Sequence, residues 1–117
     1  MASSSTPRPG SPVRGSTTGR PLMAALDLLG RRWTLRLLWE LRNGPVGPRA
    51  ILTSCNGLSS SVLYRRIGEL DDAGLVERLP DGSYALSGLG QELSEAISPL
   101  SHWSEKWARH GPSGPAD

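Results

Sequence analysis

The chain has 117 residues, a formal net charge of +2, and 37% hydrophobic against 21% charged residues, which suits one domain with a packed core. No apolar run approaches 18 residues and no apolar segment follows the basic N-terminal residues, which argues against a membrane span and a secretory signal. The single cysteine, Cys55, excludes an intramolecular disulfide and favours a cytoplasmic protein.

The charges are unevenly distributed along the sequence. Between residues 30 and 66, seven arginines stand against Glu40 alone, whereas nine acidic residues stand against three basic ones from Ile67 to the end. A basic block within a folded segment is a candidate surface for a polyanion such as nucleic acid. The alternative is a solvated helix face that carries one sign of charge.

The two ends of the chain differ in composition from its middle. Residues 1–20 are almost all Ser, Thr, Pro, Gly and Arg, so they bury too little apolar surface to offset their ordering, and we expect a disordered tail. Residues 111–117 are expected to form a flexible C-terminal tail. The folded domain is therefore predicted to span residues 21–110.

The domain is predicted to begin with three helices. Pro21 suits the first turn of a helix, which should continue to Leu29 and stop at Gly30. A short helix should begin at Pro48, and Asn56-Gly57 favours a tight turn after it. Between these two helices, four apolar residues recur at helical spacing and predict another helix: Trp33, Leu37, Leu38 and Leu41.

A longer helix is predicted over residues 59–73. Ser59 suits the N-cap position, and Gly74 suits the stop. At 100° per residue, Leu63, Ile67 and Leu70 share one face of this helix. The opposite face carries four polar or small residues, namely Ser61, Arg65, Gly68 and Asp72. Tyr64 lies on the flank of this face.

A hairpin and a long helix are predicted to complete the domain. Two short β-like runs flank Pro80-Asp81-Gly82, which favours a turn between paired strands. The final helix should span residues 89–109, with Pro99 kinking or splitting it. One apolar stripe follows its whole length: Leu89, Leu93, Ile97, Leu100, Trp103 and Trp107.

The short helix from Pro48, the tight turn and the helix over residues 59–73 match the helix-turn-helix motif. The second helix of such a motif can enter the DNA major groove, which is about 12 Å wide. Serines at its start permit close approach to phosphates, and free backbone N–H groups there favour anions. The residues predicted to contact DNA are Ser59, Ser60, Ser61, Tyr64, Arg65 and Arg66, with Arg31, Arg32, Arg36 and Arg78 as flanking contacts.

The two adjacent arginines of this helix are expected to differ in role. Arg65 points outward, where its guanidinium can reach guanine O6 and N7. Arg66 lies nearer the core and suits either a phosphate contact or an intramolecular salt bridge. For both, the alternative is a solvated helix face that pairs with Glu69 or Asp72.

Three segments carry a family resemblance: ALDLLGRRWTLRLLWEL, GLSSSVLYRRIGELDDAGLVER, and YALSGLGQEL with the Pro-Leu and Trp that follow it. Together they resemble the HxlR-type winged helix-turn-helix regulators of bacteria, a family related in fold to the MarR-type regulators. The resemblance covers about residues 22–107. It implies a mainly α-helical fold with a small β-hairpin as the wing and a long C-terminal dimerisation helix.

The resemblance also implies a transcriptional regulator that binds an inverted-repeat operator on double-stranded DNA as a homodimer. In the family, the terminal helices of both protomers form the dimer interface with help from the first helix. The apolar stripe agrees, because one small domain cannot easily bury it and tryptophans suit interface anchors. The alternative is packing of the stripe on its own core. The predicted interface residues are Leu22, Leu26, Leu93, Ile97, Leu100, Trp103 and Trp107.

Several positions depart from the family pattern. Family members often carry an oxidant-sensing cysteine just before the first helix, where this chain has Gly19-Arg20, so that mechanism is not supported. Cys55 is more typical of an inert buried thiol. Asp81 at the wing tip makes a strong minor-groove contact doubtful, although Arg78 can still reach a phosphate. Gly68 is unusual inside a helix and suits close approach of another backbone or of DNA.

A second functional hypothesis is a winged-helix adaptor that binds proteins and has lost strong DNA binding. The acidic wing tip and Ser61, where the family often has a basic residue, favour it. An enzyme is not predicted, because His102 and His110 have no ligand spacing or nucleophile partner. No metal or cofactor is predicted either, and an effector, if there is one, is left open.

Overall fold

The computed structural model describes residues 6–13 and 19–111. This part of the chain forms a helical domain with one small hairpin, as the sequence predicts. The elements in chain order are α1 (Pro21–Leu29), α2 (Thr34–Glu40), α3 (Pro48–Ser54), α4 (Ser60–Asp72), β1 (Val76–Arg78), β2 (Tyr84–Leu86), α5 (Gly88–Ile97) and α6 (Pro99–Arg109). No helix among these residues is both long and apolar enough to cross a membrane.

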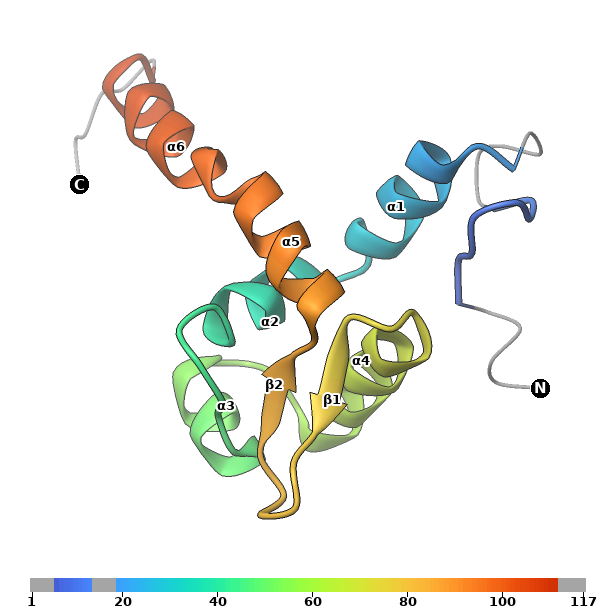
Figure 1. Ribbon diagram of the computed structural model, residues 1–117. Coiled ribbons are helices and arrows are strands. Elements are labelled where there is room, and N and C mark those ends of the chain that lie inside the picture. The colour runs from blue at the N-terminus through green and yellow to red at the C-terminus, as the bar shows by residue number, and fades with distance from the viewer. Residues whose placement is uncertain (1–5, 14–18, 112–117) are drawn as a thin grey trace.

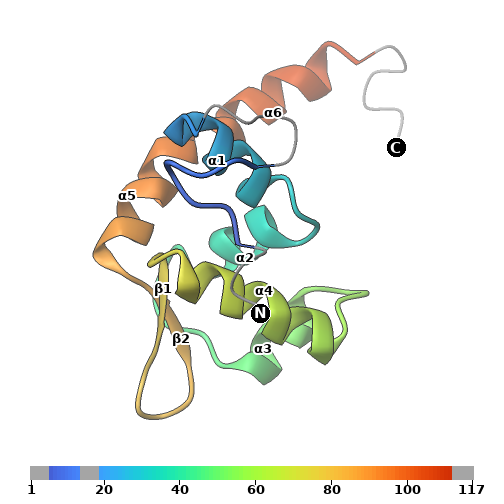
Figure 2. The same ribbon diagram turned by 90° about the vertical axis from the view of Figure 1, so that its right-hand side faces the viewer.

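The elements divide into two sides of the molecule. Figures 1 and 2 show α1, α5 and α6 on one side, with α5 and α6 forming an arm that extends away from the body. In both views the helices α3 and α4 and the turn of the hairpin lie on the opposite side. A surface for DNA and a surface for a second copy of the chain can therefore exist without overlap.

The core joins α2, α3 and α4 through their apolar faces. Leu37, Ile51 and Leu63 are fully buried, one from each of these helices. Along α4, Ile67 and Leu70 continue the buried face, as its helical periodicity predicts. The inward face of α4 is thus fixed, which leaves its other face to the solvent.

Cys55 lies inside this core. Its side chain is fully buried and forms no disulfide. Burial raises the pKa of the Cys55 thiol, although the nearby Arg36 guanidinium acts in the opposite direction. A buried thiol with a raised pKa has little of the reactive thiolate at neutral pH.

We therefore expect Cys55 to resist alkylation in the folded protein. Iodoacetamide at pH 8 should modify the native protein at least about tenfold more slowly than the urea-unfolded protein, because both access and thiolate are restricted. Mass spectrometry over time measures the two rates. Equal rates would show that the thiol is open to reagents and would reopen a role in sensing.

The hairpin packs on the end of α4. β1 and β2 are antiparallel, with Val76 opposite Leu86 and Arg78 opposite Tyr84. The linker between α2 and α3 adds a bridge that the sequence did not predict, because a single paired residue leaves no pattern: Val46 and Tyr84 exchange two backbone hydrogen bonds of 2.9 Å each. The hairpin is thereby tied to the start of α3 as well as to α4.

The long C-terminal element is split at Pro99, as predicted. Pro99 occupies the first turn of α6, and Ser98 separates α6 from α5. At the other end, α5 starts in close contact with the segment after α4. The Ser87 hydroxyl accepts a hydrogen bond from the Gly90 N–H (3.0 Å) and donates one to the Gly74 carbonyl (2.6 Å).

The start of α2 and part of the N-terminal tail differ from the sequence-based expectations. Trp33 precedes α2 in a left-handed conformation with φ 78°, so the helix begins one residue later than the apolar spacing suggests. Parts of the tail expected to be disordered, residues 1–5 and 14–18, lie outside the described residues, as do residues 112–117 of the C-terminal tail. In the described segment, Thr6 is buried and Arg8 pairs with Asp72 at 2.5 Å.

Candidate nucleic-acid interface

The helix-turn-helix consists of α3, a five-residue connection and α4. Cys55 is the C-cap of α3, and Gly57 takes φ 93° in the connection, a conformation that glycine adopts without strain. Ser59 caps α4, since its hydroxyl accepts a hydrogen bond from the Val62 N–H at 3.2 Å. This cap was predicted, and it satisfies one of the free backbone N–H groups in the first turn of α4.

The outward face of α4 carries the side chains expected to read the bases. Ser60, Ser61 and Arg65 are exposed, and Tyr64 keeps 52% of its surface exposed. The Arg65 guanidinium makes no hydrogen bond or ion pair with any residue that the structure describes. It does not pair with Glu69 or Asp72, so the solvated, paired face that the sequence left open is not formed.

Three more exposed arginines surround α4 without an ion-pair partner among the described residues. Arg32 precedes α2 and lies over the Trp33 ring, 5.9 Å from its centroid. Arg78 is in β1, next to the turn of the hairpin. Arg49 lies in the first turn of α3. It belongs to the basic block, although it was not among the residues predicted to contact DNA. Val46, two residues before α3, pairs with Tyr84 of β2, so the start of α3 lies close to the hairpin.

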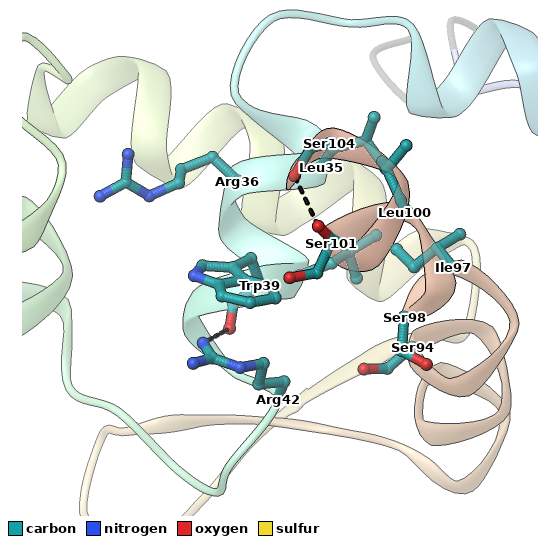
Figure 3. Close-up of a pocket in the computed structure, with 11 residues that line it drawn as sticks. Leu35, Arg36, Trp39, Arg42, Ser94, Ile97, Ser98, Leu100, Ser101 and Ser104 are labelled. Carbon is teal, nitrogen blue, oxygen red and sulfur yellow. Dashed lines mark hydrogen bonds between the residues drawn. The ribbon is translucent and has the colours of Figure 1, made fainter. Parts of the chain in front are cut away.

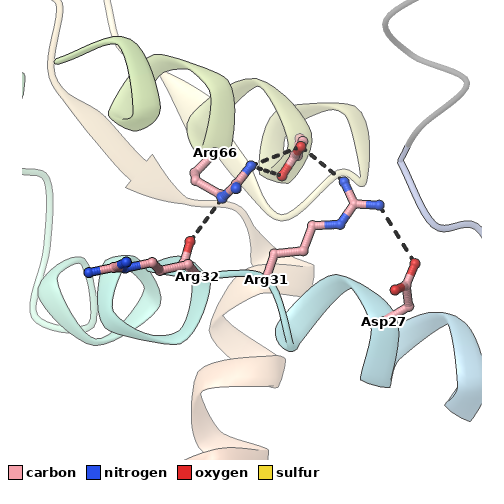
Figure 4. Close-up of polar contacts among 5 residues, drawn as sticks. Asp27, Arg31, Arg32 and Arg66 are labelled. Atoms are coloured by element: carbon pink, nitrogen blue, oxygen red, sulfur yellow. Dashed lines mark hydrogen bonds and ion pairs between the residues drawn. The ribbon is translucent and has the colours of Figure 1, made fainter. Parts of the chain in front are cut away.

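Arg31 and Arg66 have a different environment. Arg31 Nη1 lies 2.9 Å from Glu69 Oε2, and Arg66 Nη1 lies 3.1 Å from Glu69 Oε1. Both side chains are only 16% exposed, and Figure 4 shows them between α4 and the linker after α1. Arg66 thus follows the salt-bridge alternative, and the pairing of Arg31 argues against its predicted phosphate contact.

Arg36 ties two helices of the domain together. Its Nε lies 2.9 Å from Glu40 Oε2, and its Nη2 donates to the Ser54 carbonyl at 2.8 Å. The side chain is still 45% exposed. Arg36 therefore links α2 to the end of α3, and part of its side chain remains in contact with solvent.

The turn of the hairpin is shaped by Asp81. Its carboxylate accepts hydrogen bonds from the Ser83 hydroxyl (2.6 Å) and the Ser83 N–H (2.9 Å). These bonds lower the pKa of Asp81, which keeps a negative charge at the tip. The tip is thus organised by an acidic group, whereas Arg78 at the base supplies the positive charge.

Gly68 lies on the open side of α4, next to the hairpin. A Cβ at this position would meet no described atom within 4 Å, so no backbone in the described part of the chain requires a glycine here. The residue borders a shallow cleft of about 210 Å³ between α4 and the hairpin, lined also by Tyr64 and Arg78. Close approach of DNA, the other alternative from the sequence, stays a prediction.

Comparison with known proteins identifies the domain. The family model described as HxlR-like helix-turn-helix matches residues 28–112. The chain belongs to the HxlR-like helix-turn-helix family. The described part of this HxlR-like chain contains no group of three His, Cys, Asp or Glu side chains that could hold a metal ion.

Individual relatives agree with this assignment. The HTH-type transcriptional regulator YvaP of Bacillus subtilis is 30% identical over 71% of this chain and 82% of its own length. A possible HxlR family transcriptional factor from Thermoplasma volcanium has 35% identity and a TM-score of 0.65, covering 73% of this chain and 82% of that one. Quinone-bound YodB from B. subtilis has 27% identity and a TM-score of 0.67, covering 73% and 96%.

The residues expected at a dimer interface are divided between two environments in this HxlR-like protein. Leu93 and Ile97 pack partly against the core, as the alternative to dimerisation required. Leu22 and Leu26 of α1 remain 64% and 56% exposed. No residue of α6 is buried. Its three large apolar side chains are all exposed, namely Leu100, Trp103 and Trp107.

Proposed function

We propose that this protein is a homodimeric regulator that inserts α4 of each protomer into the major groove of an inverted-repeat operator. The observation that carries the proposal is the outward face of α4, where Arg65 is exposed and has no partner among the described residues. A guanidinium on this face can make paired hydrogen bonds to guanine O6 and N7. The serines before it are small enough for the helix start to approach the phosphates.

Three other exposed arginines suit phosphate contacts on either side of α4. Arg32 extends from the linker before α2, and Arg49 and Arg78 extend from α3 and the hairpin. Phosphate contacts orient the protein without reading sequence, and each one releases counterions. Affinity for duplex DNA should therefore fall steeply as salt is raised, which a protein-binding adaptor would not show.

The proposed dimer is supported by α1 and α6. Trp103 and Trp107 stack with ring centroids 5.4 Å apart and 16° between planes, yet both face solvent in the single chain. A groove of about 370 Å³ lies between α2 and the junction of α5 and α6. Figure 3 shows Trp39 on one wall of the groove and Ile97 and Leu100 on the other. Since Leu100 belongs to both surfaces, a partner helix that covers the tryptophans would also cover the groove.

No effector is assigned. The relative YodB has been crystallised with quinone bound, and the sole cysteine here is buried in the core. A response to reactive electrophiles through a surface thiol is therefore not part of the proposal. A regulator of this kind acts on cytoplasmic DNA, and we expect the protein there.

Substitution of Arg65 tests the mode of DNA binding. First, the wild-type protein selects its preferred duplexes from a random pool at two salt concentrations. Arg65→Ala should then weaken binding to the selected duplex by about 1–3 kcal/mol and relax the base preference at one position of each half-site. Gel-shift titration against the selected duplex and its single-base variants measures both effects.

Arg109→Ala is the matched control. It removes the same charge from the last turn of α6, far from α4, and should leave the base preference intact. Selection of no duplex by the wild-type protein would reject DNA binding in favour of the adaptor. An unchanged affinity and base preference in Arg65→Ala would reject the assignment of Arg65 to a base contact.

A further inference from the structure

A buried ionic network connects the recognition helix to the helix beside the proposed dimer interface. Glu69 of α4 accepts from Arg31 at 2.9 Å and from Arg66 at 3.1 Å and 3.2 Å. Arg31 extends further to Asp27 in the last turn of α1, at 3.6 Å. Arg66 Nε donates to the Arg32 carbonyl at 2.8 Å. Figure 4 shows this chain of contacts running from α1 to α4.

The network is shielded from solvent, and the charges of its four described side chains balance. The four side chains of Asp27, Arg31, Arg66 and Glu69 are between 10% and 16% exposed, and two positive charges face two negative ones. Buried ion pairs contribute little net stability, because desolvation offsets their attraction, but they hold their groups in one geometry. Glu69 is the only member that contacts both arginines, so it is the joint of the network.

We propose that Glu69 is a positioning residue that sets the distance between the two recognition helices of the dimer. The inference rests on the proposed homodimer. α1 carries Leu22 and Leu26 on its exposed face, and its last turn is linked through Arg31 to the middle of α4. A change in the position of α4 relative to α1 is doubled by the two-fold axis.

A small displacement of the two recognition helices is enough to misalign them on DNA. One base-pair step is about 3.4 Å along the duplex, so a shift of about 1.7 Å in each protomer misaligns the second helix by one step. Half-sites one helical turn apart are about 34–36 Å from centre to centre. A rigid link between α1 and α4 therefore determines which half-site spacing the dimer accepts, without any contact between Glu69 and DNA.

Two substitutions with opposite effects on charge test this role. Glu69→Gln removes a negative charge and the residue that contacts both arginines, whereas Arg31→Gln removes a positive charge and the link to α1. Each is compared with a control of the same charge change: Asp71→Asn, at an exposed position of α4, and Arg109→Gln, at the end of α6. The probes are the duplex that the wild-type protein selects, the same duplex with one base pair added or removed between the half-sites, and a scrambled duplex.

The expected result separates position from charge. On the scrambled duplex, Glu69→Gln should bind more tightly and Arg31→Gln more weakly, each like its control. On the selected duplex, both should lose at least fivefold of the wild-type preference for the native spacing, while the controls keep it. Analytical ultracentrifugation and circular dichroism confirm that each variant remains a folded dimer.

The outcomes distinguish this inference from the proposed function. If the wild-type protein selects a symmetric duplex but both variants keep its spacing preference, Glu69 has no positioning role and the inference is overturned. If Glu69→Gln does not fold, Arg31→Gln decides alone, because it leaves the pair of Glu69 and Arg66 within α4. If the wild-type protein selects no duplex, the proposed function fails, and this inference fails with it.

Discussion

Gly90→Ala is expected to lower the free energy of unfolding by about 3 kcal/mol, near the upper end for an overpacked site. A Cβ added to Gly90 would lie 2.0 Å from the carbonyl oxygen of Leu75 and 3.3 Å from Cβ of Leu86. The carbonyl cannot move away freely, since it accepts the Ser87 N–H at 2.9 Å. The variant must therefore displace the start of α5 from the end of α4. Urea denaturation followed by circular dichroism measures the loss.

Gly88→Ala provides the matched control two residues earlier in the same helix. A Cβ at Gly88 would meet nothing within 4 Å, so the change should be neutral or stabilising by up to about 1 kcal/mol through the lower entropy of the unfolded chain. A midpoint for Gly90→Ala equal to that of Gly88→Ala would mean that α5 does not pack closely on Leu75. The arm formed by α5 and α6 would then be free to move relative to the DNA-binding side.

The features that the sequence predicts well are those encoded by neighbouring residues. Pro21 opens α1 and Ser59 caps α4, and both follow from local preferences of single residue types. Gly74 and Gly82 take φ 82° and 89°, as the turn after α4 and the hairpin turn require. The split at Pro99 follows from the missing N–H and the ring of proline.

The features that the sequence does not predict depend on partners far along the chain. Arg31 and Glu69 are 38 positions apart, so a basic cluster that reads as a phosphate surface is in part an internal ion-pair network. In the sequence Gly90 looks like an ordinary helix residue, because its close contact with Leu75 exists only in the folded structure. Trp33 adopts its left-handed conformation although bulky residues disfavour it, and no local signal announces it.

The candidate site shows the same division. Helical periodicity separated the buried face of α4 from the face with Arg65, because both faces lie on one regular element. It could not separate the exposed arginines from the paired ones, since that depends on which carboxylates the tertiary fold brings near. Arg49 was missed for the same reason, because its exposure and its lack of an ion-pair partner among the described residues depend on the tertiary fold.

The double variant Trp103→Ala and Trp107→Ala is expected to weaken the homodimer by at least about 3 kcal/mol, more than about 100-fold in its dissociation constant. The two rings are 52% and 64% exposed in the single chain, so their loss removes contacts to a partner and little from the protomer's own core. Sedimentation equilibrium measures the change. Glu105→Ala is the control, since residue 105 lies on the opposite face of α6, and it should leave the dimer intact.

The same variant should reveal how dimerisation contributes to DNA binding. A dimer occupies both half-sites in one association, whereas two separate protomers each lose translational and rotational entropy when they bind. Binding to the full operator should therefore weaken at low protein concentration and recover above the new dimer dissociation constant, while binding to a single half-site stays at the wild-type level. If binding to the full operator is weakened by the same factor at every protein concentration, the tryptophans would instead act by stabilising the position of α4. A dimer of unchanged strength would exclude α6 from the interface and leave α1 as the remaining candidate.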